Sequence, residues 1–358
     1  MHAALRSFGR SALNLWTAAA LLLPSLALAL PVTLTGSLTN AGTSYTIADL
    51  QTAFTGETVT VGGNTYVGVP LWVLLGGTLG LDSSTNGNII PNGGGNNSIL
   101  RTHITATSSD GSRSLLSVGE VNRWFGGNGP ILAADVNATP TLVAYQVNGN
   151  LLDTPRLILP TDPTGTRNVV DLVSLDVGGL PQQTGPGEPS TSLTVSGGSN
   201  GTATYDRAAL EALPTTIAED VVARQGGNLL TPNDFTGVEL WELLMLAGIS
   251  HFDVLTSYVV AMGSDGYQTL FSFGELHPDY GERLAMVAYD DANGTLADGS
   301  GFARLVLDGD WRGGRYVSNL TSFFIVGNVV PEPGTLAMLM IGAVGLAANR
   351  RRPLLRRC

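Results

Sequence analysis

Few side chains in this sequence are of the types that hold metal ions or act as catalytic bases. Three histidines, His103, His251 and His277, lie between the two ends of the chain, and their surroundings show no spacing such as His-x-x-x-His that would place two imidazoles on one zinc ion. The one cysteine, Cys358, is the last residue, so the middle of the chain has neither a disulfide nor a thiolate ligand. We therefore expect no catalytic residues and no metal site, and we expect the histidines to be surface or capping residues.

Acidic residues recur beside glycines, a pattern with two chemical interpretations. Asp110-Gly111 and Asp265-Gly266 stand at corresponding places in two similar segments, which favours tight turns over catalysis. The stretch 290–299 is rich in Asp, Asn and Gly, whose oxygens suit Ca²⁺. It lacks the glutamate that closes a standard calcium loop, so we expect a solvated loop.

Arginine supplies every basic side chain, 18 in all, without a single lysine. Arg156, Arg304 and Arg315 are candidates for contacts with an anion, although for Arg156 and Arg304 pairing with one of the many carboxylates is the favoured alternative. Trp124 and Trp311 lie in Gly-rich segments, where an exposed indole could contact a surface ligand such as an exopolysaccharide.

The charge balance excludes one large class of partners. Residues 32–329 contain 28 acidic side chains and 11 arginines, a net charge of −17. A body this acidic repels nucleic acid and anionic lipid, so we expect no nucleic-acid binding. With 43% apolar and 13% charged residues and 46 glycines, the chain is too apolar to be disordered and has the composition of a β-rich exported protein.

The N-terminus has the pattern of a signal peptide. Arg6 and Arg10 precede an apolar run, and Ala27-Leu28-Ala29 provides the small-x-small pattern that signal peptidase cleaves. We predict a signal peptide over residues 1–29 with cleavage after Ala29. A short membrane anchor is the alternative.

The C-terminal residues 329–358 combine three features in a fixed order. Pro331-Glu332-Pro333 is followed by an apolar stretch over 335–348 and then by Arg350-Arg351-Arg352. Fourteen residues of helix span about 21 Å, short of a ~30 Å hydrocarbon core, yet the arginines behind them are typical of a stop-transfer signal.

This order closely resembles the PEP-CTERM sorting signal of Gram-negative bacteria. The resemblance implies a transient inner-membrane anchor formed by a transmembrane helix over 335–348. It also implies processing by the transpeptidase exosortase and a final place at the cell surface or outside the cell.

The middle of the chain consists of two similar units. Five segments recur in the same order: 45–50 with 205–210, 68–75 with 237–244, 109–121 with 264–276, 156–159 with 304–307, and 167–172 with 315–320. We predict two homologous domains, residues 30–178 and 191–328, joined by a Gly/Pro-rich linker over 179–190.

Local patterns predict an α+β fold with more strand than helix in each unit. Strands are expected at 32–38, 157–159 and 169–177 and at the corresponding 192–196, 305–307 and 317–326. Short helices are expected at 47–54, 69–76, 206–213 and 238–247, with Thr46 and Asp206 as caps. We expect one mixed sheet in each unit.

This order of elements resembles the molybdopterin-binding domain of the sulfite oxidase family, and the second unit matches better. The motifs are Ala212-Leu213-Pro214, Phe235 to Trp241, Ser264 to Tyr267, and Ala303 to Val306. The resemblance implies that Arg156, Arg304 and Arg315 could contact a pterin. The family's catalytic members hold molybdenum through a cysteine in a segment that corresponds here to 55–63 and 215–227, and neither stretch contains one.

The function predicted from these features is that of an exported cell-surface or extracellular-matrix protein, sorted by exosortase and non-catalytic, with a binding or structural role. A periplasmic molybdopterin-dependent oxidoreductase or a cofactor-binding protein is the alternative. The missing thiolate favours the first.

Overall fold

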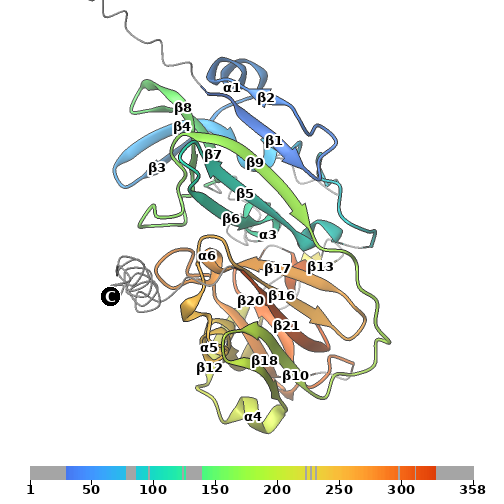
Figure 1. Cartoon of the computed structure of the whole chain (residues 1–358). Coiled ribbons are helices and arrows are strands. Elements are labelled where there is room, and N and C mark those ends of the chain that lie inside the picture. The colour runs from blue at the N-terminus through green and yellow to red at the C-terminus, as the bar shows by residue number, and fades with distance from the viewer. Residues whose placement is uncertain are drawn as a thin grey trace, which may run out of the picture.

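The computed structural model describes residues 30–77, 86–95, 97–122, 125, 139–221, 224–225, 228–229, 232–296, 299–310 and 312–327. The predicted signal peptide, the sorting signal with its transmembrane helix, Trp124 and Trp311 lie outside these residues. Figure 1 shows two stacked lobes, which we call the first half (residues 30–178) and the second half (191–327). Within the described part of the chain, no helix is long and apolar enough to cross a membrane.

The first half contains two sheets. One has the order β2-β1-β9-β5-β6, and the other has the order β3-β4-β7-β8. The strands are β1 Val32–Gly36, β2 Ser44–Tyr45, β3 Glu57–Val61, β4 Asn64–Pro70, β5 Thr102–Ser108, β6 Arg113–Ser117, β7 Leu142–Val147, β8 Asn150–Ile158 and β9 Leu172–Gly179.

The second half has the same arrangement. One sheet has the order β11-β10-β21-β16-β17, and the other has β12-β15-β18-β19 with β20 also paired to β18. The strands are β10 Leu193–Gly198, β11 Gly201–Tyr205, β12 Thr216–Val221, β15 Asn233–Glu239, β16 Tyr258–Gly263, β17 Gln268–Ser272, β18 Ala285–Asp291, β19 Gly294–Thr295, β20 Arg304–Leu307 and β21 Leu320–Val326, with a small hairpin of β13 Arg224–Gln225 and β14 Asn228–Leu229.

The expectation of one mixed sheet per unit is therefore wrong in number. In each half only the sheet given first is mixed, because β1 pairs parallel with β9 and β10 pairs parallel with β21, whereas the remaining pairs are antiparallel. We call this mixed sheet the five-stranded sheet of its half, although β20 adds a fifth strand to the antiparallel sheet of the second half. The second sheet is formed by the hairpins β3–β4 and β7–β8 and by their counterparts. The predicted strands at 157–159 and 305–307 overlap β8 and β20 of this second sheet, whereas β3, β4, β7 and their counterparts were not predicted.

The two sheets of each half pack their apolar faces together. In the first half, Leu34, Ile104 and Leu175 of the five-stranded sheet share one core with Val69, Val143 and Leu157 of the other sheet. In the second half, the corresponding set is Val195, Ala261 and Phe323 with Val238, Val287 and Leu305. Burial of this apolar surface is the main stabilising contribution in each half.

The helices are short and mostly begin at residues that cap them. They are α1 Ile47–Ala53, α2 Leu71–Leu74, α3 Val118–Val121, α4 Arg207–Glu211, α5 Leu240–Leu246 and α6 Phe273–Leu276, with 3₁₀ turns η1 Ser98–Arg101, η2 Ile249–His251 and η3 Gly313–Arg315. Thr46 caps α1 and Asp206 caps α4 as predicted, because each side chain accepts a hydrogen bond from the third helical N–H.

The connecting segment, residues 180–190, lies along one side of the molecule between β9 and β10 (Figure 1). Its backbone is hydrogen-bonded to both halves. Leu180 donates to Arg101, and Gly185 and Gly187 donate to the turn that joins β16 to β17. A segment with Gly/Pro-rich composition therefore has a defined path over the second half.

Candidate functional site

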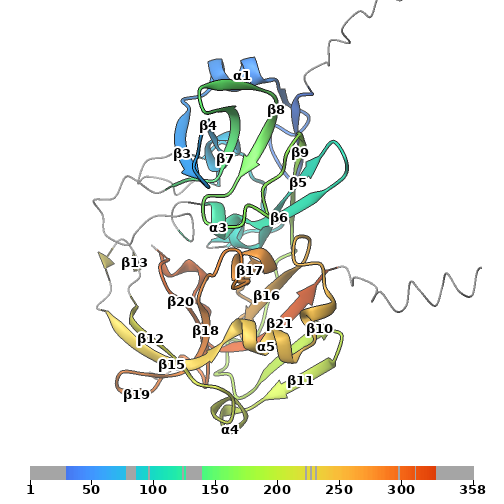
Figure 2. The same ribbon diagram turned by 90° about the vertical axis from the view of Figure 1, so that its left-hand side faces the viewer.

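The two halves meet through the ends of β6 and β17, where each strand leads into a one-turn helix (Figure 2). The sequence Ser117-Val-Gly-Glu120 begins α3, and Ser272-Phe-Gly-Glu275 begins α6. Each serine accepts a hydrogen bond from the glutamate N–H three residues later, at 2.9 and 3.0 Å. This cap turns the chain sharply and directs both glutamates into the interface.

Each glutamate pairs with a buried arginine of its own half. Arg167 Nη2 lies 2.8 Å from both carboxylate oxygens of Glu120. Arg315 donates to Glu275, and it also forms a bidentate pair with Asp310, at 2.8 Å from Nε and 2.6 Å from Nη2. Both guanidinium groups are almost completely buried, which makes each arginine depend on these partners.

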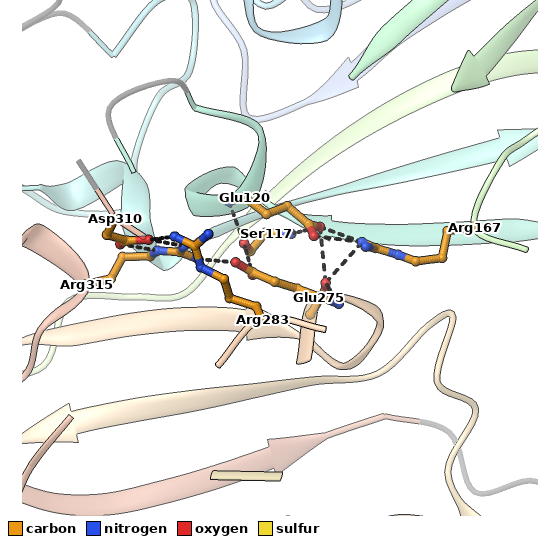
Figure 3. Close-up of polar contacts among 8 residues, drawn as sticks. Ser117, Glu120, Arg167, Glu275, Arg283, Asp310 and Arg315 are labelled. Carbon is orange, nitrogen blue, oxygen red and sulfur yellow. Dashed lines mark hydrogen bonds and ion pairs between the residues drawn. The ribbon is translucent and has the colours of Figure 1, made fainter. Parts of the chain in front are cut away.

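Reciprocal bonds cross from one half to the other (Figure 3). Ser117 Oγ donates to Glu275 Oε2 at 2.9 Å, and Ser272 Oγ donates to Glu120 Oε1 at 3.1 Å. The two bonds are related by pseudo-two-fold symmetry. Within each half the serine caps the helix that carries its own glutamate, and across the interface it donates to the glutamate of the other half. We refer to Ser117, Glu120, Arg167, Ser272, Glu275, Asp310 and Arg315 as the interface network.

Two glycines let the arginines cross the interface. A Cβ added at Gly119 would lie 2.6 Å from Cδ of Arg315, and a Cβ at Gly274 would lie 2.5 Å from Nε of Arg167. Each arginine therefore lies directly against the helix of the other half. Glycine is required at both positions because a larger residue would occupy the space of the guanidinium stem.

The network holds more acidic than basic groups. It contains the three carboxylates of Glu120, Glu275 and Asp310 and the two arginines Arg167 and Arg315, and Arg283 also donates to Asp310. Burial, opposed by Arg167 and assisted by the charge of Glu275, raises the pKa of Glu120 to about 7. Burial lowers the pKa of Arg315, but Asp310 and Glu275 outweigh it and the net change is upward. Burial therefore favours the protonated form of Glu120.

Other contacts extend the interface beyond the network. The rings of His103 and Tyr258, which occupy corresponding positions at the starts of β5 and β16, stack with centroids 5.2 Å apart. Leu115 N–H donates to Leu255 O at 2.7 Å. Because these contacts join backbone, aromatic and ionic groups along the same surface, the halves form one body.

The predicted anion contacts are not brought together. Arg156 and Arg304 lie at corresponding positions on β8 and β20, in different halves, whereas Arg315 belongs to the network. Among the described residues Arg304 forms no ion pair within 4.0 Å, although the charge of Asp291 acts on its guanidinium. Its guanidinium instead lies over the rings of Phe235 and Tyr316, 5.6 and 6.0 Å from their centroids.

The other predicted residues have ordinary structural environments. Asp110 and Asp265 each accept a hydrogen bond from the N–H two residues later, which confirms the two turns. His277 packs between Trp241 and Tyr280, and His103 lies in the interface, so neither is a plain surface residue. Within the described ranges, no three His, Cys, Asp or Glu side chains gather as metal ligands.

The letters Gly-x-Ser-x-Gly occur at 197–201, but these residues form the turn between β10 and β11 and not a strand-to-helix elbow.

Sequence reasoning missed the interface network, although its signal was present. The segments that contain Ser117-x-x-Glu120 and Ser272-x-x-Glu275 were paired, as were Arg167 and Arg315, but the serines, the glutamates and Arg167 were assigned no role and Arg315 was expected to contact an anion. A capping box repeated in both units, together with a repeated buried arginine, was the available signal.

Comparison with known proteins identifies the C-terminus. Residues 329–352 match the PEP-CTERM protein-sorting motif, so the chain carries this signal as predicted. No curated protein matches the chain. The sulfane dehydrogenase SoxCD from Paracoccus pantotrophus is similar in structure, with 20% identity over 39% of this chain and 39% of that chain and a TM-score of 0.33. A likeness of this extent carries no information about activity.

The residues do not fit a thiolate-held molybdenum centre. In both halves the segment that would carry the cysteine forms an edge strand, β3 or β12, and contains Thr, Val, Glu and Asp side chains without a thiol. Hard oxygen donors do not replace a soft thiolate ligand. The buried guanidinium of Arg315, which could hold an anion, is already bound to two carboxylates.

Proposed function

We propose that this chain is a non-catalytic protein of the cell surface or extracellular matrix, built on two homologous units. A signal peptide over residues 1–29 exports it, and a transmembrane helix over 335–348 retains it in the inner membrane until exosortase processes it at Pro331-Glu332-Pro333. The PEP-CTERM motif at 329–352 is the observation that carries this proposal, because such a motif has no role in a protein that stays in the cytoplasm.

The arrangement of the ionisable groups supports the non-catalytic part of the proposal. The buried acids and bases of the interface network are hydrogen-bonded to one another. A catalytic acid or base must reach a substrate proton within hydrogen-bond distance. Because these groups are bonded to one another, they hold the two halves together, as expected of a protein with a binding or structural role.

Cell fractionation tests the sorting proposal. In a host that contains exosortase, the wild-type chain should reach the outer surface or the medium in a shortened form. A variant with Pro331→Ala, Glu332→Ala and Pro333→Ala should stay in the inner membrane at full length, as should the wild-type chain in a strain that lacks exosortase. Equal surface delivery of the wild type and the triple variant would refute processing at this triplet.

Metal and pterin analysis tests the non-catalytic proposal. The chain would be expressed with export in a host that makes molybdopterin, and molybdenum would be measured by mass spectrometry. We expect less than stoichiometric molybdenum and no pterin. Stoichiometric amounts of either would favour the oxidoreductase, and would make Arg156 and Arg304 the first residues to replace.

A further inference from the structure

The outer face of the five-stranded sheet in the second half carries a pocket of about 430 Å³. Its floor consists of side chains from β10, β16, β17 and β21, and Leu180, Pro181 and Gln183 of the connecting segment form one wall. The pairing of Val260 with Phe324 and of Met262 with Ser322 places these side chains on the face opposite the core. This volume is within the range of about 300–1,000 Å³ that small-molecule sites have.

The corresponding face of the first half is polar, which shows that the fold does not require apolar residues there. Where the second half has Val260, Met262 and Phe324, the first half has Thr105, Thr107 and Asp176, at the same places in the strand pairing. Asp176 is exposed and accepts a hydrogen bond from Thr35 at 2.6 Å. Phe324, in contrast, leaves 54% of its surface exposed. An exposed aromatic ring in a pocket is a common feature of binding sites.

One polar group in the pocket has no partner. Gln268 is only 8% exposed, and its Oε1 accepts no hydrogen bond from the described residues. Its counterpart at the start of β6, Arg113, is exposed to solvent. A buried acceptor without a donor costs free energy, which a bound hydroxyl group would recover.

We infer that this pocket binds a neutral, hydroxylated sugar ring of a polysaccharide, with the apolar face of the ring on Phe324 and Met262 and its hydroxyl groups toward Gln268, Ser196 and Ser322. This inference deepens the proposed function and rests on it, because it names what the surface protein holds.

The charge of the pocket decides between ligand classes. Its lining contains Leu, Pro, Gln, Ser, Val, Met and Phe, and no charged side chain. The acidic body around it repels anionic ligands. A purely apolar ligand would leave Oε1 of Gln268 unpaired, whereas a neutral sugar has both an apolar face and hydroxyl groups that can donate to it.

Binding by the full chain, purified after export, tests the inference. The probes are cellopentaose, mannopentaose and galactopentaose as neutral sugars, an oligoguluronate as an acidic sugar, and a proline-rich peptide, each titrated by calorimetry. At least one neutral sugar should bind, and Phe324→Asp should weaken that binding about tenfold or more, because the stacking platform is lost. Asp is the residue that the first half holds at this position, so the variant should fold.

Ile217→Asp is the matched control. Ile217 is 60% exposed on β12, in the other sheet of the same half, and the substitution changes the net charge by the same amount. Its affinity should equal that of the wild type. Gln268→Ala should weaken binding less than Phe324→Asp does.

Three results would overturn the assignment: no binding of any neutral sugar, equal affinity in the wild type and Phe324→Asp, or tighter binding of the acidic sugar or the peptide. The proposed function is tested separately, by cell fractionation. Sugar binding without surface delivery would contradict the sorting proposal alone. Surface delivery without sugar binding would contradict the pocket alone.

Discussion

The two halves use the same strand order for different purposes. At the interface they are nearly reciprocal, since each contributes a capping serine, a glutamate, a glycine and a buried arginine. On the outer faces of their five-stranded sheets they differ, with Thr105, Thr107 and Asp176 in one and Val260, Met262 and Phe324 in the other. Similar residues at the interface therefore hold the halves together, and dissimilar residues outside give the second half a surface of its own.

The two halves contribute different numbers of charged partners to the interface network. Arg315 is bound to two carboxylates, whereas Arg167 has one, and Asp162, the counterpart of Asp310, accepts backbone N–H groups instead. Arg167 Nη1 has no hydrogen-bond partner in the described part of the chain. The second half thus carries the stronger ionic centre, and replacement of corresponding residues should have unequal effects.

The largest effect is expected when the two arginines are compared. Arg315→Met should lower the free energy of unfolding by about 3–5 kcal/mol, because Glu275 would remain as a buried charge without an ion-pair partner and Asp310 would keep only Arg283. Arg167→Met should cost less, about 1–3 kcal/mol, since its partner Glu120 can take up a proton. Urea unfolding measures both. Equal losses in the two variants would show that the ionic centres are equivalent.

Glu120 should make the stability of the protein depend on pH. Its pKa is raised to about 7 from an ordinary value of 4.5, so the folded state binds more protons than the unfolded state between these values. The stability from this group is fully present below about pH 4.5 and is lost as the pH rises through about 7, on the order of 3 kcal/mol.

Urea midpoints at about pH 5 and about pH 8 test this dependence. The wild type should lose stability toward the higher pH, and Glu120→Gln should lose less, because its amide does not ionise. Glu211→Gln, at an exposed glutamate that pairs with Arg207, serves as the control and should follow the wild type. A Glu120→Gln profile that matches the wild type would assign the proton to another group.

A smaller effect is expected from the interface glycines. Gly119→Ala and Gly274→Ala should each cost about 1–3 kcal/mol, because the added methyl group overlaps an arginine that its ion pairs hold in place. Gly119→Ala should be the more damaging, since Arg315 has the stronger ionic centre. Thermal unfolding gives the comparison, and Gly111→Ala is not a suitable control because Gly111 has φ of +89°. Gly94→Ala, which has open space around it, is suitable.

The smallest effect on stability is expected at the outer face. Met262→Thr and Phe324→Asp install the residues of the first half, and each should change the free energy of unfolding by less than about 1 kcal/mol. Chemical denaturation measures the change. A loss of several kcal/mol would mean that Phe324 is a core residue of the second half and not a free surface.

Much of the architecture could be predicted from the sequence because it depends on local chemistry. Thr46 and Asp206 cap their helices through atoms within three residues, and the Asp-Gly turns at 110–111 and 265–266 are equally local. The PEP-CTERM signal is linear, so its order of residues was sufficient to find it. Of the second sheet only β8 and β20 were predicted in part, and the hairpin partners β3, β4 and β7 were missed although Gly62-Gly63 and Asn148-Gly149 form their two-residue turns.

Only the tertiary structure decided what the arginines do. The sequence grouped Arg156, Arg304 and Arg315 as anion contacts, but side chains of the same type were placed over aromatic rings in one case and between carboxylates in another. Burial and the distance to an opposite charge set the role of an arginine, and both depend on residues from remote segments. The exposure of Phe324 also depends on the tertiary structure. The sequence pattern marks it only as a strand residue, and its exposure is set by the packing of the sheets and by the path of the connecting segment.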